Sequence, residues 1–134
     1  MSRITPNREQ FEALAHAPDE GPVVMLNLLK FKARADDEQG SGADAYRRYG
    51  DAAVEMIEAR GGRVLWTGRG EQVLIGDPAE DWDAVFLIEY PSRRAFLEMV
   101  STPEYADAHA HRESGLERTV VVACTARIDR IGDR

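Results

Sequence analysis

Two hydrophobic periodicities alternate along this chain, and together they predict the order of its helices and strands. Apolar residues three and four positions apart indicate the buried stripe of a helix, whereas short apolar runs between glycine, proline and charged residues indicate strands. The strand-like runs are VVMLNLLKF, RVLWTGRGEQVLIGDP, WDAVFLIEY and LERTVVVACTARI. Helical patterns precede the first run, follow it from Asp44 to Gly61, and separate the last two runs as two pieces broken at Thr102-Pro103.

This order predicts an α+β domain of the ferredoxin-like class. A leading helix is followed by β-α-β-β-α-β, in which the second helix of the unit is split in two. That pattern is typical of a four-stranded antiparallel sheet with both helices on one face. The 134 residues are expected to form a single domain, 1–134, with its core at about 22–128.

Local signals mark where the first two helices are expected to begin. The leading helix is predicted over about 6–17, with Thr5 as its cap and Pro6 at its first position. The segment 32–44 is polar and rich in glycine, so it is predicted to be a loop. Asp44 at the end of that loop is the expected cap of the next helix.

Both faces of the predicted sheet are apolar, which is unusual for an antiparallel sheet with one face in water. In the first strand, Val24, Leu26 and Leu28 lie on one face, and Val23, Met25, Leu29 and Phe31 lie on the other with Asn27. The leading helix is too short to cover four strands. A large apolar surface usually marks an association site, and twofold dimers are the commonest closed assemblies, so we expect a homodimer packed sheet against sheet.

Several motifs resemble one known family. Its pattern joins a Gly-Gly after the first helix to a strand ending in Gly-Asp, then a strand running into Glu-Tyr-Pro-Ser and a Ser-Pro-Glu-Tyr-like helix start. Here these correspond to Gly61-Gly62, Gly76-Asp77, Glu89–Ser92 and Thr102–Tyr105. The chain therefore resembles the domain-of-unknown-function 1330 family (DUF1330) over most of residues 44–124. It departs from short members in its leading helix, its 32–44 loop and its C-terminal extension.

The resemblance implies a fold and leaves the activity open. The DUF1330 family is similar to the dimeric α/β-barrel superfamily, which includes cofactor-independent monooxygenases, lactone-forming isomerases and haem-handling enzymes. It therefore implies a dimeric α/β barrel with a pocket between sheet and helices or inside the barrel, walled by apolar residues with a few polar groups. Because one fold supports many functions, activity has to be argued from individual residues.

Asn27 is the first candidate for a ligand-binding residue, because its amide lies inside an otherwise apolar strand. A buried amide needs hydrogen-bonding partners. The neighbouring backbone or a dimer contact could supply them, and so could a ligand. If both sheet faces are covered, Asn27 should line either the dimer barrel or a cavity bordering it.

Three further candidates lie on the second and third strands. Trp66 and Arg69 flank a glycine bend, where an indole and a guanidinium could bind an anionic or aromatic ligand. A core tryptophan with a surface arginine is the alternative. Glu89 ends an apolar strand, and a partly buried carboxyl there could act as a catalytic base with a raised pKa. A salt bridge or a helix-cap contact explains Glu89 equally well.

The segment YADAHAHRE contains the densest group of candidates: Tyr105 for ligand binding, and His109 and His111 for acid–base catalysis. Two residues of a helix that are two positions apart point about 200° away from each other, so the two histidines cannot bind one metal ion together. His109 and Glu113 share a face, as do Asp107 and His111. Solvent-exposed charge pairs are the alternative interpretation. No metal site and no cofactor is predicted.

Charge and composition exclude some partners. The net charge is −7, with 24 acidic and 17 basic residues, and no basic stripe is present, so we expect no nucleic-acid partner. The apolar runs are much shorter than the roughly 20 residues that span a membrane, so no membrane partner is expected. The N-terminus lacks the apolar centre of a signal peptide, and the single Cys124 cannot form an internal disulfide. These features predict a cytoplasmic protein.

The sequence supports two main hypotheses about function. In the first, a small homodimeric enzyme uses an apolar pocket to bind a small organic acid or aromatic substrate and carries out a cofactor-free oxidation or an isomerisation. In the second, the same pocket binds a metabolite without turnover. A purely structural dimerisation domain is a third alternative. The position of the candidate residues relative to one cavity separates these hypotheses.

Overall fold

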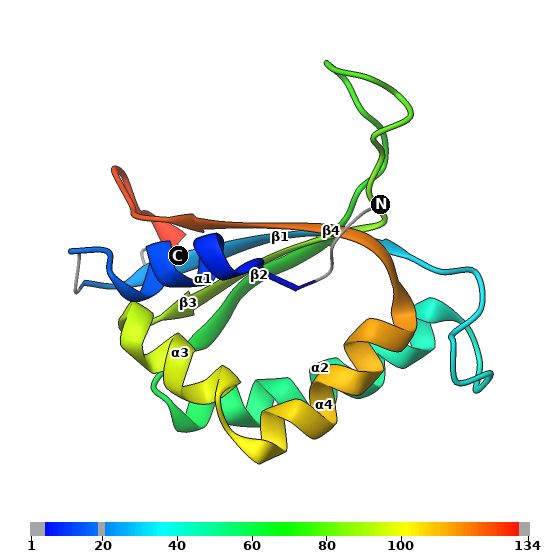
Figure 1. Cartoon of the computed structure of the whole chain (residues 1–134). Coiled ribbons are helices and arrows are strands. Elements are labelled where there is room, and N and C mark those ends of the chain that lie inside the picture. The colour runs from blue at the N-terminus through cyan, green and yellow to red at the C-terminus, as the bar shows by residue number, and fades with distance from the viewer. Residues whose placement is uncertain (1–4, 19–20, 132–134) are drawn as a thin grey trace.

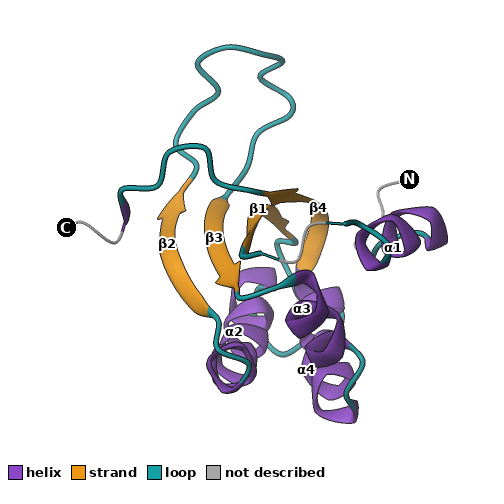
Figure 2. Cartoon of the chain, turned by 90° about the vertical axis from the view of Figure 1, so that its left-hand side faces the viewer, coloured by secondary structure: helices purple, strands orange, loops and turns teal. Residues whose placement is uncertain are grey.

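The computed structural model describes residues 5–18 and 21–131, and it has the predicted α+β architecture. Helices α2, α3 and α4 cover one face of a four-stranded sheet, and α1 lies beside the β4 edge (Figures 1 and 2). The elements are α1 (Arg8–Ala15), β1 (Val23–Phe31), α2 (Gly42–Ala59), β2 (Arg63–Arg69), β3 (Ala84–Tyr90), α3 (Arg93–Val100), α4 (Pro103–Gly115) and β4 (Leu116–Cys124). The split of the last helical region into α3 and α4 is confirmed.

The sheet is antiparallel throughout, in the order β2-β3-β1-β4. Alternate residues of the central strand β1 are buried against the helices, as its apolar pattern predicts. Residues opposite one another on neighbouring strands share a face, so Phe86 and Val121 lie on the helix side with Asn27. The core on that side centres on Val23, Met25, Leu29, Ile57, Met99 and Leu116, all nearly inaccessible to solvent.

Two helix caps differ from the sequence predictions. α1 is capped by Asn7 rather than Thr5: the Asn7 side chain accepts from the Gln10 backbone, and the Gln10 side chain accepts from the Asn7 backbone. α2 is capped by Ser41, and Asp44 accepts the Ser41 N–H instead of capping the helix itself. In both cases a reciprocal capping box satisfies two backbone N–H groups, whereas a single cap residue satisfies one.

The α2 N-terminus and the α4 C-terminus meet at two glycines. The Lys32 N–H donates to the Gly115 carbonyl at 2.8 Å, and the Gly42 N–H donates to the Lys32 carbonyl at 2.9 Å. A Cβ on Gly42 would lie 2.5 Å from the Gly115 carbonyl oxygen and 2.6 Å from the Lys32 nitrogen. This backbone contact positions α4, and therefore every α4 side chain that faces the sheet.

The second strand is shorter than its apolar pattern predicts. β2 pairs with β3 only as far as Arg69 opposite Ala84, so the predicted strand character of residues 70–77 is wrong. Residues 70–83 form a projecting loop, which we call the arm (Figure 1). A strand requires a partner, and β3 offers none beyond Ala84. Apolar character alone therefore does not extend the sheet.

The sheet face away from the helices, which we call the open face, is apolar as predicted. The register places on it Val24, Leu26, Leu28, Val85, Leu87, Val120 and Val122. Among residues 5–18 and 21–131, no helix lies over this face (Figures 1 and 2). In the same ranges, no helix combines the length and apolar character needed to cross a membrane.

Candidate functional site

A cavity of about 1230 Å³ lies between the helix side of the sheet and helices α1, α2, α3 and α4. Apolar side chains from the sheet and from α3 form much of its wall, including Met25, Ile88, Phe96 and Val121. The polar residues that line it between the two layers include Asn27, Tyr46, Tyr49, Tyr105, His109 and Arg112, and α1 and α3 add Arg8, Gln10, Glu12 and Arg93. Three of the predicted site residues, Asn27, Tyr105 and His109, therefore meet in one cavity.

Asn27 faces this cavity from the centre of β1. It is 9% exposed, and its Nδ2 donates to the Met25 carbonyl at 3.0 Å. The amide is thus held by backbone of its own strand while its residue lines the cavity wall. Asn27 therefore lies on the cavity side of β1, and the open face lies on the opposite side of the strand.

An aromatic wall runs from α2 to α4. The Tyr46 and Tyr49 rings lie 5.2 Å apart, and the Tyr49 and Tyr105 hydroxyls share a hydrogen bond of 3.0 Å. Burial raises the pKa of Tyr46 to about 12, although the Arg112 guanidinium opposes this shift. Burial also raises the pKa of Tyr49, with Tyr105 adding to the effect. These phenols therefore stay protonated at neutral pH and can donate hydrogen bonds.

His109 offers a free acceptor beside this wall. Its Nε2 lies 3.2 Å from the Glu113 carboxylate, so the ring proton is assigned to Nε2. Its Nδ1 is buried and has no hydrogen-bond partner within the described part of the chain. Burial lowers the pKa of His109, the Arg112 guanidinium lowers it further, and Glu113 opposes both. The lowered pKa favours the neutral imidazole at pH 7, in which the Nδ1 lone pair has no partner among the described residues.

Arg112 is the functional candidate that the sequence analysis missed. It is 7% exposed, lines the same cavity, and lies one helical turn after His109 on α4. Charged residues are almost never this deeply buried without a specific interaction, and Arg112 has one with the Tyr46 side chain. A signal was present in the sequence, because positions 105, 109 and 112 follow the spacing of one helix face. Arginines on helices are usually solvent-exposed, so this spacing alone does not single out Arg112.

Trp66 and Glu89 lie outside the cavity, on the open face. A bulge between Val64 and Trp66 shifts the register, so Trp66 sits opposite Leu87 and is 45% exposed. Glu89 accepts from the Arg63 Nε at 3.1 Å, which is the salt-bridge alternative considered for it. Strand alternation places both side chains away from the helices.

Arg69 and His111 are also separate from the cavity. Arg69 is exposed at the end of β2 and pairs with Glu71 at 2.8 Å. The His111 Nδ1 accepts from the Arg48 Nε at 3.4 Å, on a different side of α4 from His109. The opposite directions of the two histidines are as helix geometry requires.

Two further features of the described residues bear on where the site lies. No group of three histidine, cysteine, aspartate or glutamate side chains is gathered closely enough there to hold a metal ion. A smaller hollow of about 560 Å³ lies between α1 and α3, lined by Arg93, Arg94 and Glu98 among others. None of the residues predicted for the site lines it, so the larger cavity is the candidate site.

The strand order and one-sided helices define a ferredoxin-like α+β protein with a cavity between its two layers. The chain belongs to the DUF1330 family, a domain of unknown function whose pattern matches residues 39–125. No curated protein matches the sequence.

Several solved structures resemble this chain. A protein of unknown function from Rhodopseudomonas palustris is 38% identical, with a TM-score of 0.90 over 96% of this chain and 100% of that one. SnoaB, a cofactor-independent oxygenase from Streptomyces nogalater, is 13% identical, with a TM-score of 0.54 over 81% and 96% of the two chains. A dabb family protein with a ferredoxin-like fold from Mesorhizobium loti is 16% identical, with a TM-score of 0.52 over 80% and 98%. The last two show the fold alone.

Proposed function

We propose that this protein binds a small organic acid with an apolar, preferably aromatic, body in the cavity between sheet and helices. The observation that carries the proposal is Arg112, a guanidinium buried in the wall of a largely apolar cavity. Arginine presents a planar set of donors that matches a carboxylate, and such charge-assisted hydrogen bonds are strong.

The rest of the cavity suits the same ligand class. Met25, Ile88 and Phe96 can contact an apolar body, and protonated tyrosines offer donors near the charged end. Small-molecule sites usually combine an apolar wall with a few converging polar groups, as here. The cavity's volume exceeds the typical range of about 300–1,000 Å³, so a one-ring acid fits with room to spare.

Benzoate and its uncharged counterpart benzamide test this proposal. Titrated into the ¹⁵N-labelled protein, benzoate should shift the amide resonances of Asn27, Tyr105, His109 and Arg112 in a saturable way. Benzamide should bind more weakly, because it lacks the charge that Arg112 recognises. Shifts confined to residues outside the cavity, or equal affinity for the two compounds, would contradict the proposal.

A second candidate function is catalytic, and the free Nδ1 of His109 favours it. A neutral imidazole with one nitrogen oriented by a carboxylate is a suitable general base. It could remove a proton from carbon next to a carbonyl of the bound acid, giving an enolate and an imidazolium. Returning the proton to a different atom completes an isomerisation. No cofactor is needed for this proton transfer.

The rate at which the CH₂ protons of phenylpyruvate exchange for deuterium in D₂O measures the activity of such a base. The protein should accelerate loss of the CH₂ signal in the proton NMR spectrum, and His109→Gln should slow it about 100-fold. Because the His109 pKa is lowered below 6.5, the rate should be constant above that pH. Below the lowered pKa the exchange rate should fall about tenfold per pH unit, since a protonated Nδ1 cannot accept a proton.

His111→Gln is the matched control and should retain the wild-type exchange rate. Equal rates for His109→Gln and wild type would exclude His109 as the base.

We also propose that the protein is a homodimer, packed through the open face. Val24, Leu26, Leu28 and Val122 leave an apolar surface on the side of the sheet that the helices do not cover, and such a surface usually marks an association site. Such a face is costly in water unless another surface covers it. A monomeric sedimentation profile at micromolar concentration would contradict this proposal.

Two adjacent residues of β4 give a matched test of the dimer. Val121 and Val122 are each 44% exposed, but Val121 lines the cavity and Val122 lies on the open face. Val122→Asp should raise the dimer dissociation constant at least 100-fold, because it would bury a carboxylate at the interface. Val121→Asp should leave the dissociation constant unchanged. Equal effects of the two substitutions would place the interface elsewhere.

A further inference from the structure

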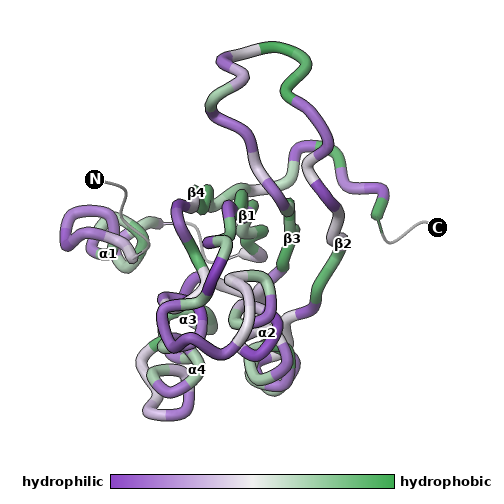
Figure 3. Tube along the Cα trace, turned by 90° about the vertical axis from the view of Figure 1, so that its right-hand side faces the viewer, coloured by the Kyte–Doolittle hydropathy of each residue, from purple (hydrophilic) through white to green (hydrophobic). Residues whose placement is uncertain are grey.

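The arm, residues 70–83, ends in an exposed apolar tip. It leaves the sheet on the side away from the helices, in both Figure 1 and Figure 2. Leu74 is 83% exposed and Ile75 is 92% exposed, and the hydrophobic tip is visible at the far end of the arm in Figure 3. The five acidic residues of the arm all lie outside 72–76, so the tip itself carries no charge.

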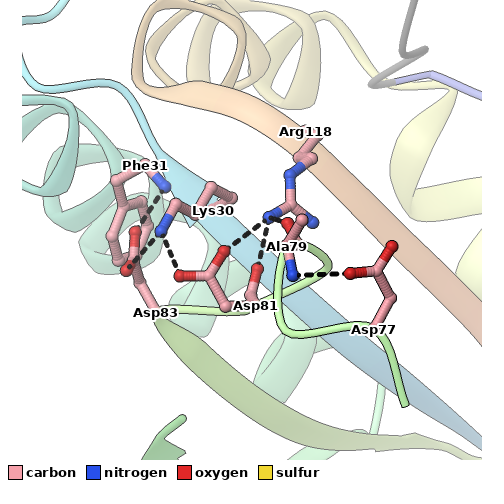
Figure 4. Close-up of polar contacts among 7 residues, drawn as sticks. All are labelled: Lys30, Phe31, Asp77, Ala79, Asp81, Asp83 and Arg118. Carbon is pink, nitrogen blue, oxygen red and sulfur yellow. Dashed lines mark hydrogen bonds and ion pairs between the residues drawn. The ribbon is translucent and has the colours of Figure 1, made fainter. Parts of the chain in front are cut away.

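The root of the arm is held to the sheet by a cluster of charged side chains (Figure 4). The Lys30 Nζ lies 2.9 Å from the Asp81 carboxylate and 3.4 Å from that of Asp83. The Arg118 Nη2 lies 3.0 Å from the Asp81 Oδ1, and its guanidinium stacks 4.4 Å from the Trp82 ring centre. These contacts join the arm to both β1 and β4.

Backbone hydrogen bonds fix the same root. The Asp83 N–H donates to the Leu29 carbonyl at 2.8 Å. The Asp83 carboxylate accepts the Phe31 N–H at 2.9 Å (Figure 4). The Gly70 N–H donates to the Asp83 carbonyl at 3.1 Å, which closes the base of the arm. A projecting segment fixed at its base loses little conformational freedom when it binds, so it is well suited to docking.

The length of the arm exceeds the spacing between two packed sheets. The shorter limb, from Gly70 to Leu74, has five residues, which span at most about 17 Å when fully extended. Two sheets that pack face to face lie about 10 Å apart. An arm that rises from the open face of one copy therefore passes beyond the sheet of a second copy packed on that face, and its tip reaches the flank of that copy.

The open face alone is small for a stable interface. Four strands about 4.8 Å apart, paired over about 23 Å, give a sheet face of roughly 440 Å². A stable interface buries about 800 Å² on each partner. The arm is a projecting apolar segment on the same side, so it can add to the area that the open face buries.

We infer that the arm is a clasp: in the homodimer, the Leu74–Ile75 tip of each copy packs against the flank of the other copy. This inference rests on the proposed homodimer and adds to it the contact that makes the dimer stable. The fixed root directs the arm, the apolar tip supplies the buried surface, and twofold symmetry provides two such contacts per dimer.

Sedimentation across a dilution series of the full-length protein tests the clasp. The double variant Leu74→Ser/Ile75→Ser should raise the dimer dissociation constant at least tenfold, while its unfolding at high dilution matches that of wild type, since both side chains are exposed in the single chain. Val54→Ser on α2 removes a partly exposed valine on the helical layer, away from the open face, and should leave the dissociation constant unchanged.

The possible outcomes distinguish failure of the clasp proposal from failure of the homodimer proposal. A dimeric wild type whose dissociation constant is unchanged in the tip variant would overturn the clasp and leave the dimer intact; a tip that docks on a different protein would give this result. A wild type that is monomeric at micromolar concentration would overturn both. A weakened dimer in the tip variant, with Val54→Ser unaffected, supports the clasp.

Discussion

Gly42→Ala is expected to lower the free energy of unfolding by about 3 kcal/mol, which is at the upper end for overpacking a well-packed site. The added methyl group would meet backbone atoms of Lys32 and Gly115, and neither backbone can rotate away. Relief requires α4 to shift relative to α2. Because α4 carries Tyr105, His109 and Arg112, the same substitution should also disturb the cavity.

Gly50→Ala is the matched control for this prediction. Gly50 lies within the same helix, and a Cβ there meets no heavy atom of the described residues within 4 Å. Alanine in an open helix interior is favoured over glycine by up to about 1 kcal/mol, so Gly50→Ala should raise the free energy of unfolding. Urea denaturation of both variants measures the contrast. Equal urea midpoints for Gly42→Ala and Gly50→Ala would show that the Gly42–Gly115 contact tolerates a methyl group.

Arg112→Gln is expected to weaken benzoate binding by about 30-fold or more, because removing one partner of a buried charged hydrogen bond typically costs at least 2 kcal/mol. Benzamide affinity should change little, since glutamine can still hydrogen-bond an uncharged amide. The selectivity between the two compounds is therefore the specific readout, and calorimetric titration measures it.

Arg48→Gln is the control for the loss of an arginine from a helix. Arg48 pairs with Asp37 at 2.8 Å outside the cavity, so its loss should leave benzoate affinity unchanged. A loss of both benzoate and benzamide binding in Arg112→Gln would indicate a collapsed cavity rather than a lost charge contact. Unchanged benzoate affinity in that variant would contradict the proposed site.

Much of the fold could be predicted because its signals are local. The buried alternation of β1 shows in its own sequence, and Thr102-Pro103 marks the break between α3 and α4. Gly61, at a φ of 79°, ends the α2 region with a conformation that glycine adopts freely. The β2 boundary was wrong because strand length depends on the partner strand, and residues 73–75 are as apolar as a true strand.

The candidate site could be predicted only in part. Asn27, Tyr105 and His109 converge, because a polar residue on a buried strand face and a polar helix face must both point between the layers. The bulge that turns Trp66 to the open face is a property of the β2–β3 register. The burial of Arg112 depends on how closely α4 approaches α2.

The sequence by itself determined the ferredoxin-like order of elements, the apolar character of both sheet faces, and the presence of an amide inside β1. Each depends on periodicity within a short segment. Only the tertiary structure decided which polar residues share a cavity, that Arg112 is among them, and that residues 70–83 project as an arm. Those features depend on register and on helix–helix approach, which bring together residues far apart in the chain and leave little trace in any one segment.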